Sequence, residues 1–144
     1  MSPPPLPPAP PAGGIYHPVL RVDNLLYVSG QGPVKADGSL ITGKVGGDLS
    51  LEEGKQAARQ VGLTMLSTIQ EQGYLPSVYR LVKTLGMVNC TMEFMDQPDV
   101  INGFSALMEE LRGQEFGRGA RSAVGMILPG NIAVEVETIF ELRE

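Results

Sequence analysis

The stretch from Arg80 to Thr91 constrains the fold most, because apolar side chains occupy both of its alternating faces. One face carries Leu81, Leu85 and Met87, and the other carries Val82, Val88 and Cys90. A strand of this kind is covered on both sides. A layer of helices can cover one side. In a chain of 144 residues, the size of one domain, a second subunit is the economical cover for the other side.

Helices are predicted before and after this strand. Ser50 and Glu53 fit a capping box at the start of a helix over 51–72. Small residues at four-residue steps keep one face of this helix shallow, and we expect its backbone to approach the sheet closely there. These residues are Gly54, Ala58 and Gly62. A second helix is predicted to begin at Asp96 and to stop at Gly113.

Two pairs of strands complete the predicted domain. Residues 19–22 and 25–29 flank Asp23-Asn24, whose short side chains suit a tight turn. Residues 122–128 and 132–142 are separated by a connection of hairpin length, so we expect them to pair with each other. This order of elements predicts an α+β domain, with two helices packed on one face of a mixed, mostly antiparallel sheet.

The second predicted hairpin gathers the residues best suited to chemistry. Its apolar side, which includes Val124 and Met126, is expected to face the helices. Its other side carries Arg121, Ala123, Gly125, Glu135 and Glu137. An arginine beside very small residues leaves open space above the sheet, and the carboxylates lie at its edge. We interpret this side as the floor of a pocket.

Arg121 has two interpretations at this stage. Its guanidinium can hold a planar carboxylate through two parallel hydrogen bonds, or it can form an ion pair with Glu137. Glu135 is farther from Arg121 along the strands, which suits a small ligand between them or a Glu135 supplied by a neighbouring subunit. A carboxylate near a bound substrate can order a water molecule and move a proton. The alternative is that Glu135 is a solvent-exposed glutamate without a catalytic role, which is common on strands.

Other reactive side chains have weaker support. Tyr16 precedes the first strand and either closes over a site or is a half-buried aromatic at its rim. His17, the only histidine, has no recognisable partner for a catalytic triad or a metal site. Cys90, the only cysteine, is interpreted as a small core residue, and it excludes an intramolecular disulfide framework. We therefore predict no metal site.

Charge and the ends of the chain limit partners and location. A formal net charge of −5 provides no broad cationic surface for nucleic acid. No apolar run is long enough to span a bilayer, and the N-terminus lacks a secretory signal, so we expect a cytoplasmic protein without a membrane partner. Residues 1–14 are rich in proline and are predicted to be a disordered leader before a domain over 15–144.

Three sequence runs resemble the RidA family, also named YjgF/YER057c/UK114. They are LLYVSGQGPV at 25–34, DQPDVINGF at 96–104 and GARSAVGMILPGNIAVEVE at 119–137. The similarity extends from about Tyr16 to the C-terminus and indicates a divergent bacterial branch. It implies a chorismate-mutase-like fold, a homotrimer with sites in the clefts between subunits, and hydrolysis of reactive enamines or imines such as 2-aminoacrylate to 2-keto acids and ammonia, without a cofactor.

The resemblance also implies roles for individual residues. The family's arginine, which clamps the substrate carboxylate, matches Arg121, and its water-activating glutamate matches Glu135. The substrate-binding positions match Tyr16, Gly30, Asn102 and Ala123. Archetypal members carry cysteine where this chain has Ala123, and the loop over 36–48 is longer here. A trimer that binds keto acids without turnover is the alternative, and an endoribonuclease or translation inhibitor is the third.

Overall fold

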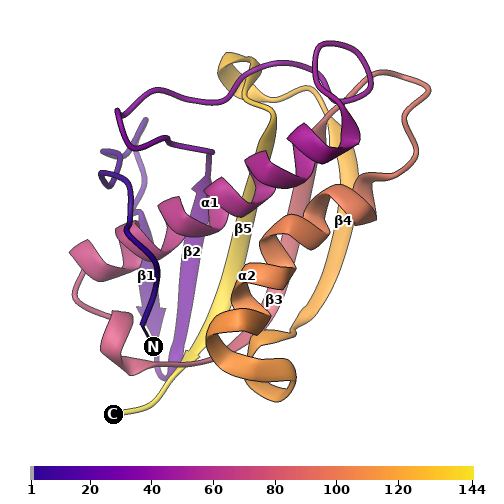
Figure 1. Cartoon of the computed structure of the whole chain (residues 1–144). Helices are drawn as coiled ribbons and strands as arrows, with labels where there is room; N and C mark the ends of the chain where they lie inside the picture. The colour runs from indigo at the N-terminus through magenta and orange to yellow at the C-terminus, as the bar shows by residue number, and fades with distance from the viewer. Residues whose placement is uncertain (1) are drawn as a thin grey trace.

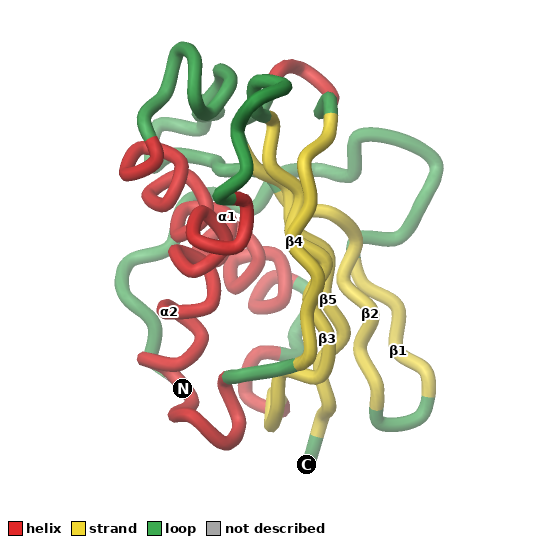
Figure 2. The backbone as a smooth tube through the Cα atoms, turned by 90° about the vertical axis from the view of Figure 1, so that its right-hand side faces the viewer, coloured by secondary structure: helices red, strands yellow, loops and turns green. Residues whose placement is uncertain are grey.

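The structure, a computed structural model, describes residues 2–144 as one sheet covered on one face by two helices (Figure 1). Figure 2 shows both helices on the same side of the sheet. The strands are β1 (Val19–Val22), β2 (Leu25–Gln31), β3 (Val78–Asn89), β4 (Ala120–Met126) and β5 (Val134–Leu142). The helices are α1 (Leu51–Glu71) and α2 (Gln97–Gly117), with short 3₁₀ turns at Leu75–Ser77 and Pro129–Asn131. The predicted α+β fold is confirmed.

The strands follow the order β1-β2-β5-β3-β4 across the sheet. The predicted hairpin of β1 and β2 is confirmed, with Val22 opposite Leu25 and Asp23 at a φ of 55° in the turn. The predicted hairpin of β4 and β5 is wrong. Strand β4 pairs with β3 in parallel, and β5 lies between β2 and β3, antiparallel to both.

A helix placed between two strands explains this topology. Parallel neighbours need a long crossover connection, and α2 provides it between β3 and β4. Residues 127–133 then cross the end of β3, where the backbone N–H of Asn89 donates to the carbonyl of Ala133 at 2.9 Å. To pass from β4 to β5, on the far side of β3, the chain has to cover only two strand spacings, about 10 Å. A connection of hairpin length therefore serves a different pairing.

The parallel pairing reverses the predicted faces of β4. Gly86 of β3 lies beside Ala123, and a Cβ at Gly86 would meet Ile101 of α2 at 2.6 Å, so this face lies under the helices. Val124 and Met126, predicted to face the helices, instead point to the uncovered face and are 37% and 43% exposed. This side of β4 therefore belongs to the face of the sheet that the helices leave uncovered.

The helices pack closely on each other through glycine. The predicted capping box of α1 is confirmed by reciprocal hydrogen bonds between Ser50 and Glu53. The expectation that small residues of α1 face the sheet is wrong for Gly62, where a Cβ would meet Leu107 of α2 at 2.7 Å. At Gly103 of α2, a Cβ would lie 2.8 Å from the carbonyl carbon of Lys55. The shallow face of α1 therefore receives α2.

The regular part of the second helix ends at the predicted residue, although α2 continues to Gly117. Gly113 has a φ of 77°, a left-handed conformation that ends the regular part of α2 before a last short turn. The core between the helices and the sheet includes Phe104, Phe140, Leu26 and Met65, all buried. Among the described residues, no helix has the length and apolar character needed to cross a membrane.

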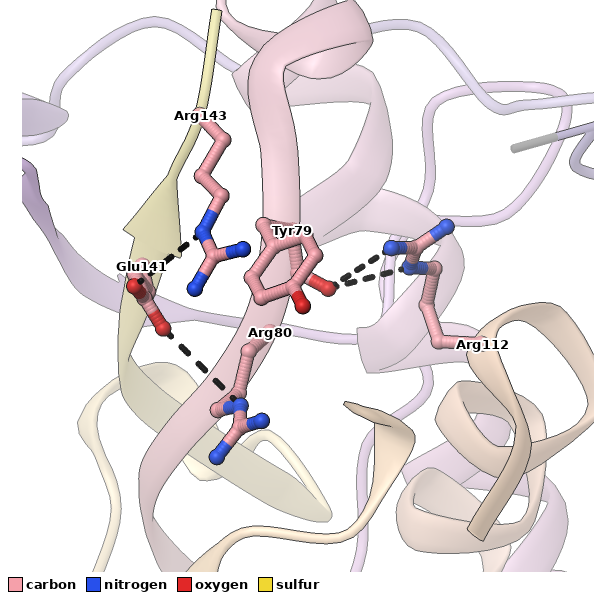
Figure 3. A network of polar contacts seen from close by, with 5 residues as sticks. All are labelled: Tyr79, Arg80, Arg112, Glu141 and Arg143. Atoms are coloured by element: carbon pink, nitrogen blue, oxygen red, sulfur yellow. Dashed lines mark hydrogen bonds and ion pairs between the residues drawn. The ribbon is translucent and has the colours of Figure 1, made fainter. Parts of the chain in front are cut away.

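A polar network fixes the end of the sheet farthest from the β4–β5 connection (Figure 3). Arg143 lies 3.7 Å from the centre of the Tyr79 ring, and Arg112 donates to the Tyr79 carbonyl at 2.7 and 3.2 Å. The Glu141 carboxylate forms ion pairs with both Arg80 and Arg143. Its oxygens lie 3.8 Å from Arg80 Nε and 3.6 Å from Arg143 Nε. These contacts join the end of β5 to β3 and α2.

The proline-rich leader, predicted to be disordered, lies along α1 in the structure. Pro7 is buried, Leu6 packs against the core, and the Ser67 hydroxyl donates to the Pro7 carbonyl at 2.7 Å. The prediction of a mobile leader depends on how chain termini usually behave, and it does not include a donor from elsewhere in the chain for the proline carbonyl groups. A buried hydroxyl on α1 supplies this donor.

The close helix contact gives a stability prediction. Gly→Ala inside a helix ordinarily stabilises by up to about 1 kcal/mol. Gly103→Ala is expected to destabilise by about 2 kcal/mol, because the new methyl group would press on the Lys55 backbone and separate the helices. Urea denaturation measures the difference. Ala106→Gly, on the exposed side of the same helix, is the control and should cost about 1 kcal/mol from propensity alone. A stabilising Gly103→Ala would contradict the packing.

Candidate active site

Arg121 projects from edge strand β4 toward α2. Its partner across the parallel ladder is Thr84, and its guanidinium donates to the Ser105 hydroxyl at 3.0 Å and to the Pro98 carbonyl at 3.3 Å. No carboxylate of the described residues lies within 4.0 Å of it. The ion pair with Glu137 is excluded within one chain, because Glu137 lies on the other face of the sheet.

A hollow of about 470 Å³ surrounds this guanidinium, and we name it the arginine hollow. Its lining includes Asn102, Ser105, Glu109, Arg118 and Arg121. Arg118 binds Glu109 at 2.7 Å, and this hydrogen bond holds the pKa of the Glu109 carboxyl below its usual value. The two charges of that pair offset each other. Arg121 is then the one lining cation among the described residues without an anionic partner.

Glu135 lies on β5 opposite Met87, on the face of the sheet away from the helices. A Cβ at Gly30 would collide with its carboxylate, so glycine is what lets Glu135 lie against the end of β2. Burial, reinforced by the negative charge of Glu137, raises the pKa of the Glu135 carboxyl. In the folded chain this carboxyl therefore holds its proton to higher pH than a solvated glutamate.

A second hollow of about 340 Å³ contains this carboxylate, and we name it the glutamate hollow. Tyr16, Gly30, Gln31 and Glu135 line it. The Tyr16 hydroxyl accepts a hydrogen bond from the Gly13 backbone at 3.0 Å. Gln31 is buried, accepting from Thr68 at 2.9 Å and donating to the Ser29 carbonyl at 3.0 Å.

The structure thus brings the predicted site residues together in two groups. Tyr16, Gly30 and Glu135 share the glutamate hollow, while Asn102 and Arg121 share the arginine hollow. Because Arg121 and Glu135 lie on opposite faces of the sheet, a single chain does not join them. The prediction of one shared pocket floor is wrong within the chain.

Ala123 lines neither hollow. It packs against the core on the helix side of β4. Cys90 packs on the same core, and its sulfur accepts a hydrogen bond from Gln97 at 3.6 Å. His17 lines a separate hollow, beside Tyr27 and Lys83. The described residues contain no group of three His, Cys, Asp or Glu side chains able to hold a metal ion.

Sequence reasoning missed the groups that hold Arg121 and floor the glutamate hollow. Ser105 lies one helical turn after Ile101, and only the fold places it beside Arg121. Gln31 follows Gly30 directly, within the quoted run at 25–34, but no pattern in the sequence indicates its partner Thr68 on α1. Both contacts join segments far apart along the chain.

Known proteins are similar to this chain in sequence and in fold. Protein TCP17 of Trypanosoma cruzi is 43% identical over 120 residues, covering 82% of this chain and 75% of that protein. The structure of Atu1372, a protein of unknown function from Agrobacterium tumefaciens, is 39% identical with a TM-score of 0.82, covering 88% of this chain and 82% of that one. No family model matches the chain.

Two further structures identify the fold. A Shewanella oneidensis protein named "a putative endoribonuclease" is 29% identical with a TM-score of 0.87, covering 95% of this chain and 91% of that one. RidA from an Antarctic Psychrobacter has the same fold at a TM-score of 0.63 and 24% identity, covering 92% of this chain and 93% of that one. Architecture and similarity together define a chorismate-mutase-like α+β protein. The chain belongs to the RidA family.

The electrostatics of Glu135 give a titration prediction. Glu137→Gln is expected to lower the pKa of Glu135, because it removes a neighbouring negative charge. NMR titration of the glutamate side-chain carbonyl carbons measures it. Glu141→Gln, farther along the same strand, is the control and should leave the Glu135 titration unchanged. An unchanged pKa in Glu137→Gln would show that this repulsion is absent.

The same shift affects stability. A carboxyl whose folded pKa is raised favours folding in its protonated form, so its contribution is lost as pH rises from the unfolded pKa through the folded pKa. Glu135→Gln should remove this part of the pH dependence of unfolding.

Proposed function

We propose that this protein hydrolyses 2-imino acids of the 2-aminoacrylate type to 2-keto acids and ammonia. The observation that carries the proposal is Arg121, a guanidinium that lies in a hollow, is held by Ser105 and the Pro98 carbonyl, and has no anionic partner among residues 2–144. Such a group binds a planar carboxylate through two charge-assisted hydrogen bonds. The family resemblance assigns the same role to Arg121.

The reaction needs positioning more than chemical activation, because an imine carbon is already electrophilic. Water adds its oxygen to this carbon and gives a proton to Glu135, which passes it to nitrogen to form a carbinolamine. Glu135 then takes the proton of the new hydroxyl group and gives it to the nitrogen as the C–N bond breaks, so that ammonia leaves and a 2-keto acid remains. A carboxyl with a raised pKa is better matched to proton transfer near neutral pH than a solvated one. No cofactor takes part.

The two halves of this site are supplied by different subunits of a homotrimer in our proposal. Arg121 lies on edge strand β4, whose outer edge pairs with no other strand in the part of the chain that the structure describes. The uncovered face of the sheet exposes apolar side chains that a second copy would bury. They are Leu20, Val22, Tyr27, Val124 and Met126, each between 37% and 52% exposed. In our proposal the outer edge of a neighbouring β4 lies beside Glu135, so that the neighbour's Arg121, which points away from its Val124, reaches the glutamate hollow past this edge.

A second candidate is a trimer that binds keto acids without turnover. It is favoured by the completeness of the arginine hollow, which binds a carboxylate without help from Glu135. Titration with pyruvate beside an imine-hydrolysis assay distinguishes the two, because a pure binder gives saturation without ammonia release. RNA cleavage is a weaker alternative, since the net charge of −5 opposes binding to a phosphate backbone.

Mixed assemblies test the shared site directly. Arg121→Ala and Glu135→Gln are each expected to lose at least about 100-fold in kcat/KM, since each removes a charged contact to substrate or water. Co-assembly of the two inactive variants should restore activity to about a quarter of wild type, because random mixing pairs an intact arginine with an intact glutamate in about a quarter of sites. Arg59→Ala, on the exposed surface of α1, is the charge-matched control.

Two results would contradict this assignment. No recovery in confirmed mixed assemblies would place both groups in one chain's site. Unchanged hydrolysis by folded Arg121→Ala would remove the arginine from the mechanism altogether.

Assembly itself is tested at the uncovered face. Val124→Glu is expected to dissociate the trimer, because it would bury a charge against the partner's apolar surface. Light scattering after size exclusion measures the mass. Glu52→Gln, exposed at the start of α1, is the control and should leave the mass unchanged. A trimeric mass for folded Val124→Glu would place the contact elsewhere.

A further inference from the structure

The leader is held on α1 by contacts that suit a proline-rich chain. Proline has no backbone N–H, so a segment of this kind can lie on a helix without leaving donors unpaired. Its carbonyl groups still need donors. Ser67, 7% exposed, supplies one to Pro7 at 2.7 Å, and Leu6 packs against the core beside it. The leader therefore has an apolar anchor and a polar anchor.

Beyond these anchors the leader reaches the candidate active site. Pro10, Pro11, Ala12 and Gly13 line the glutamate hollow together with Glu135. The Gly13 backbone N–H donates to the Tyr16 hydroxyl at 3.0 Å, which joins the end of the leader to the tyrosine of the same hollow. Removing the leader would therefore remove one wall of this hollow and leave Glu135 in place.

The leader forms an apolar wall of the glutamate hollow, and other apolar side chains line the hollow with it. Leu40, Pro129 and Ile132 also line the hollow. The polar residues at its floor, Gln31 and Thr68, hydrogen-bond to each other and need no ligand. Glu135 and the Tyr16 hydroxyl, which accepts from Gly13 and can still donate, are then the side-chain polar groups available to a bound molecule. A ligand that fills this hollow would place a polar reacting group at Glu135 and an apolar side chain against the prolines.

We propose that residues 6–13 are a specificity wall of the active site, which favours imino acids with bulky apolar side chains over small ones. This inference rests on the proposed hydrolysis of imino acids. The prolines contribute by being rigid, because a wall that is fixed before binding loses little entropy when the side chain packs on it. Ser67 acts through the leader as a positioning residue.

The test compares two substrates in the full chain, in a variant lacking residues 2–12, and in Ser67→Ala. Imino acids derived from leucine and from alanine are generated by an amino-acid oxidase, and kcat/KM is measured for each. In the full chain the leucine-derived substrate should be preferred. The deletion should reduce this preference about tenfold, through KM, because it removes apolar contact with the larger side chain. Ser67→Ala should reduce the preference by a smaller factor.

Matched measurements separate the possible failures. Ser77→Ala, whose hydroxyl lies outside the leader contact, is the control for Ser67→Ala and should keep the full preference. An unchanged preference in both the deletion and Ser67→Ala would overturn the wall. If the full chain hydrolyses neither substrate, the proposed function fails. In that case, affinities for 4-methyl-2-oxopentanoate and pyruvate are measured by calorimetry in the full chain and in the deletion variant. A smaller preference for 4-methyl-2-oxopentanoate over pyruvate in the deletion variant supports the specificity wall, and an equal preference overturns it.

Discussion

The parallel pairing of β3 with β4 determines on which faces of the sheet Arg121 and Glu135 lie. It places Arg121 opposite Thr84 on the helix side of the sheet, and it leaves room for β5 on the other edge of β3. Glu135 on β5 then faces away from the helices. One sheet thus separates Arg121, which we propose binds the substrate carboxylate, from Glu135, which we propose transfers the proton, so that a site using both needs another copy of the chain.

Two opposing electrostatic effects would meet at Glu135 in such an assembly. Within the chain, burial and the charge of Glu137 raise the pKa of its carboxyl. A guanidinium arriving from a neighbouring subunit would favour the ionised form and oppose both effects. A substrate carboxylate bound to that guanidinium would in turn reduce its influence. Binding and proton transfer would be coupled through Arg121 in this scheme.

Glycine allows this arrangement at two places. Gly30 leaves the space that the Glu135 carboxylate occupies, and Gly103 lets α2 approach the backbone of α1. The first position shapes the glutamate hollow, while the second fixes the helix that carries Asn102 and Ser105 to the arginine hollow. The leader adds a third element, since its prolines reach the glutamate hollow from an anchor on α1.

The sequence by itself determined the features that depend on residues a few positions apart: the capping box at Ser50, the turn at Asp23, and the end of the regular helix at Gly113. Family resemblance also selected Arg121 and Glu135. Only the tertiary structure decided which strand pairs with β4, and so which face carries Arg121. Alternation of side chains shows that a strand has two faces, but it carries no information about which strand lies beside it. The parallel pairing depends on α2, which connects β3 to β4 and packs on both strands.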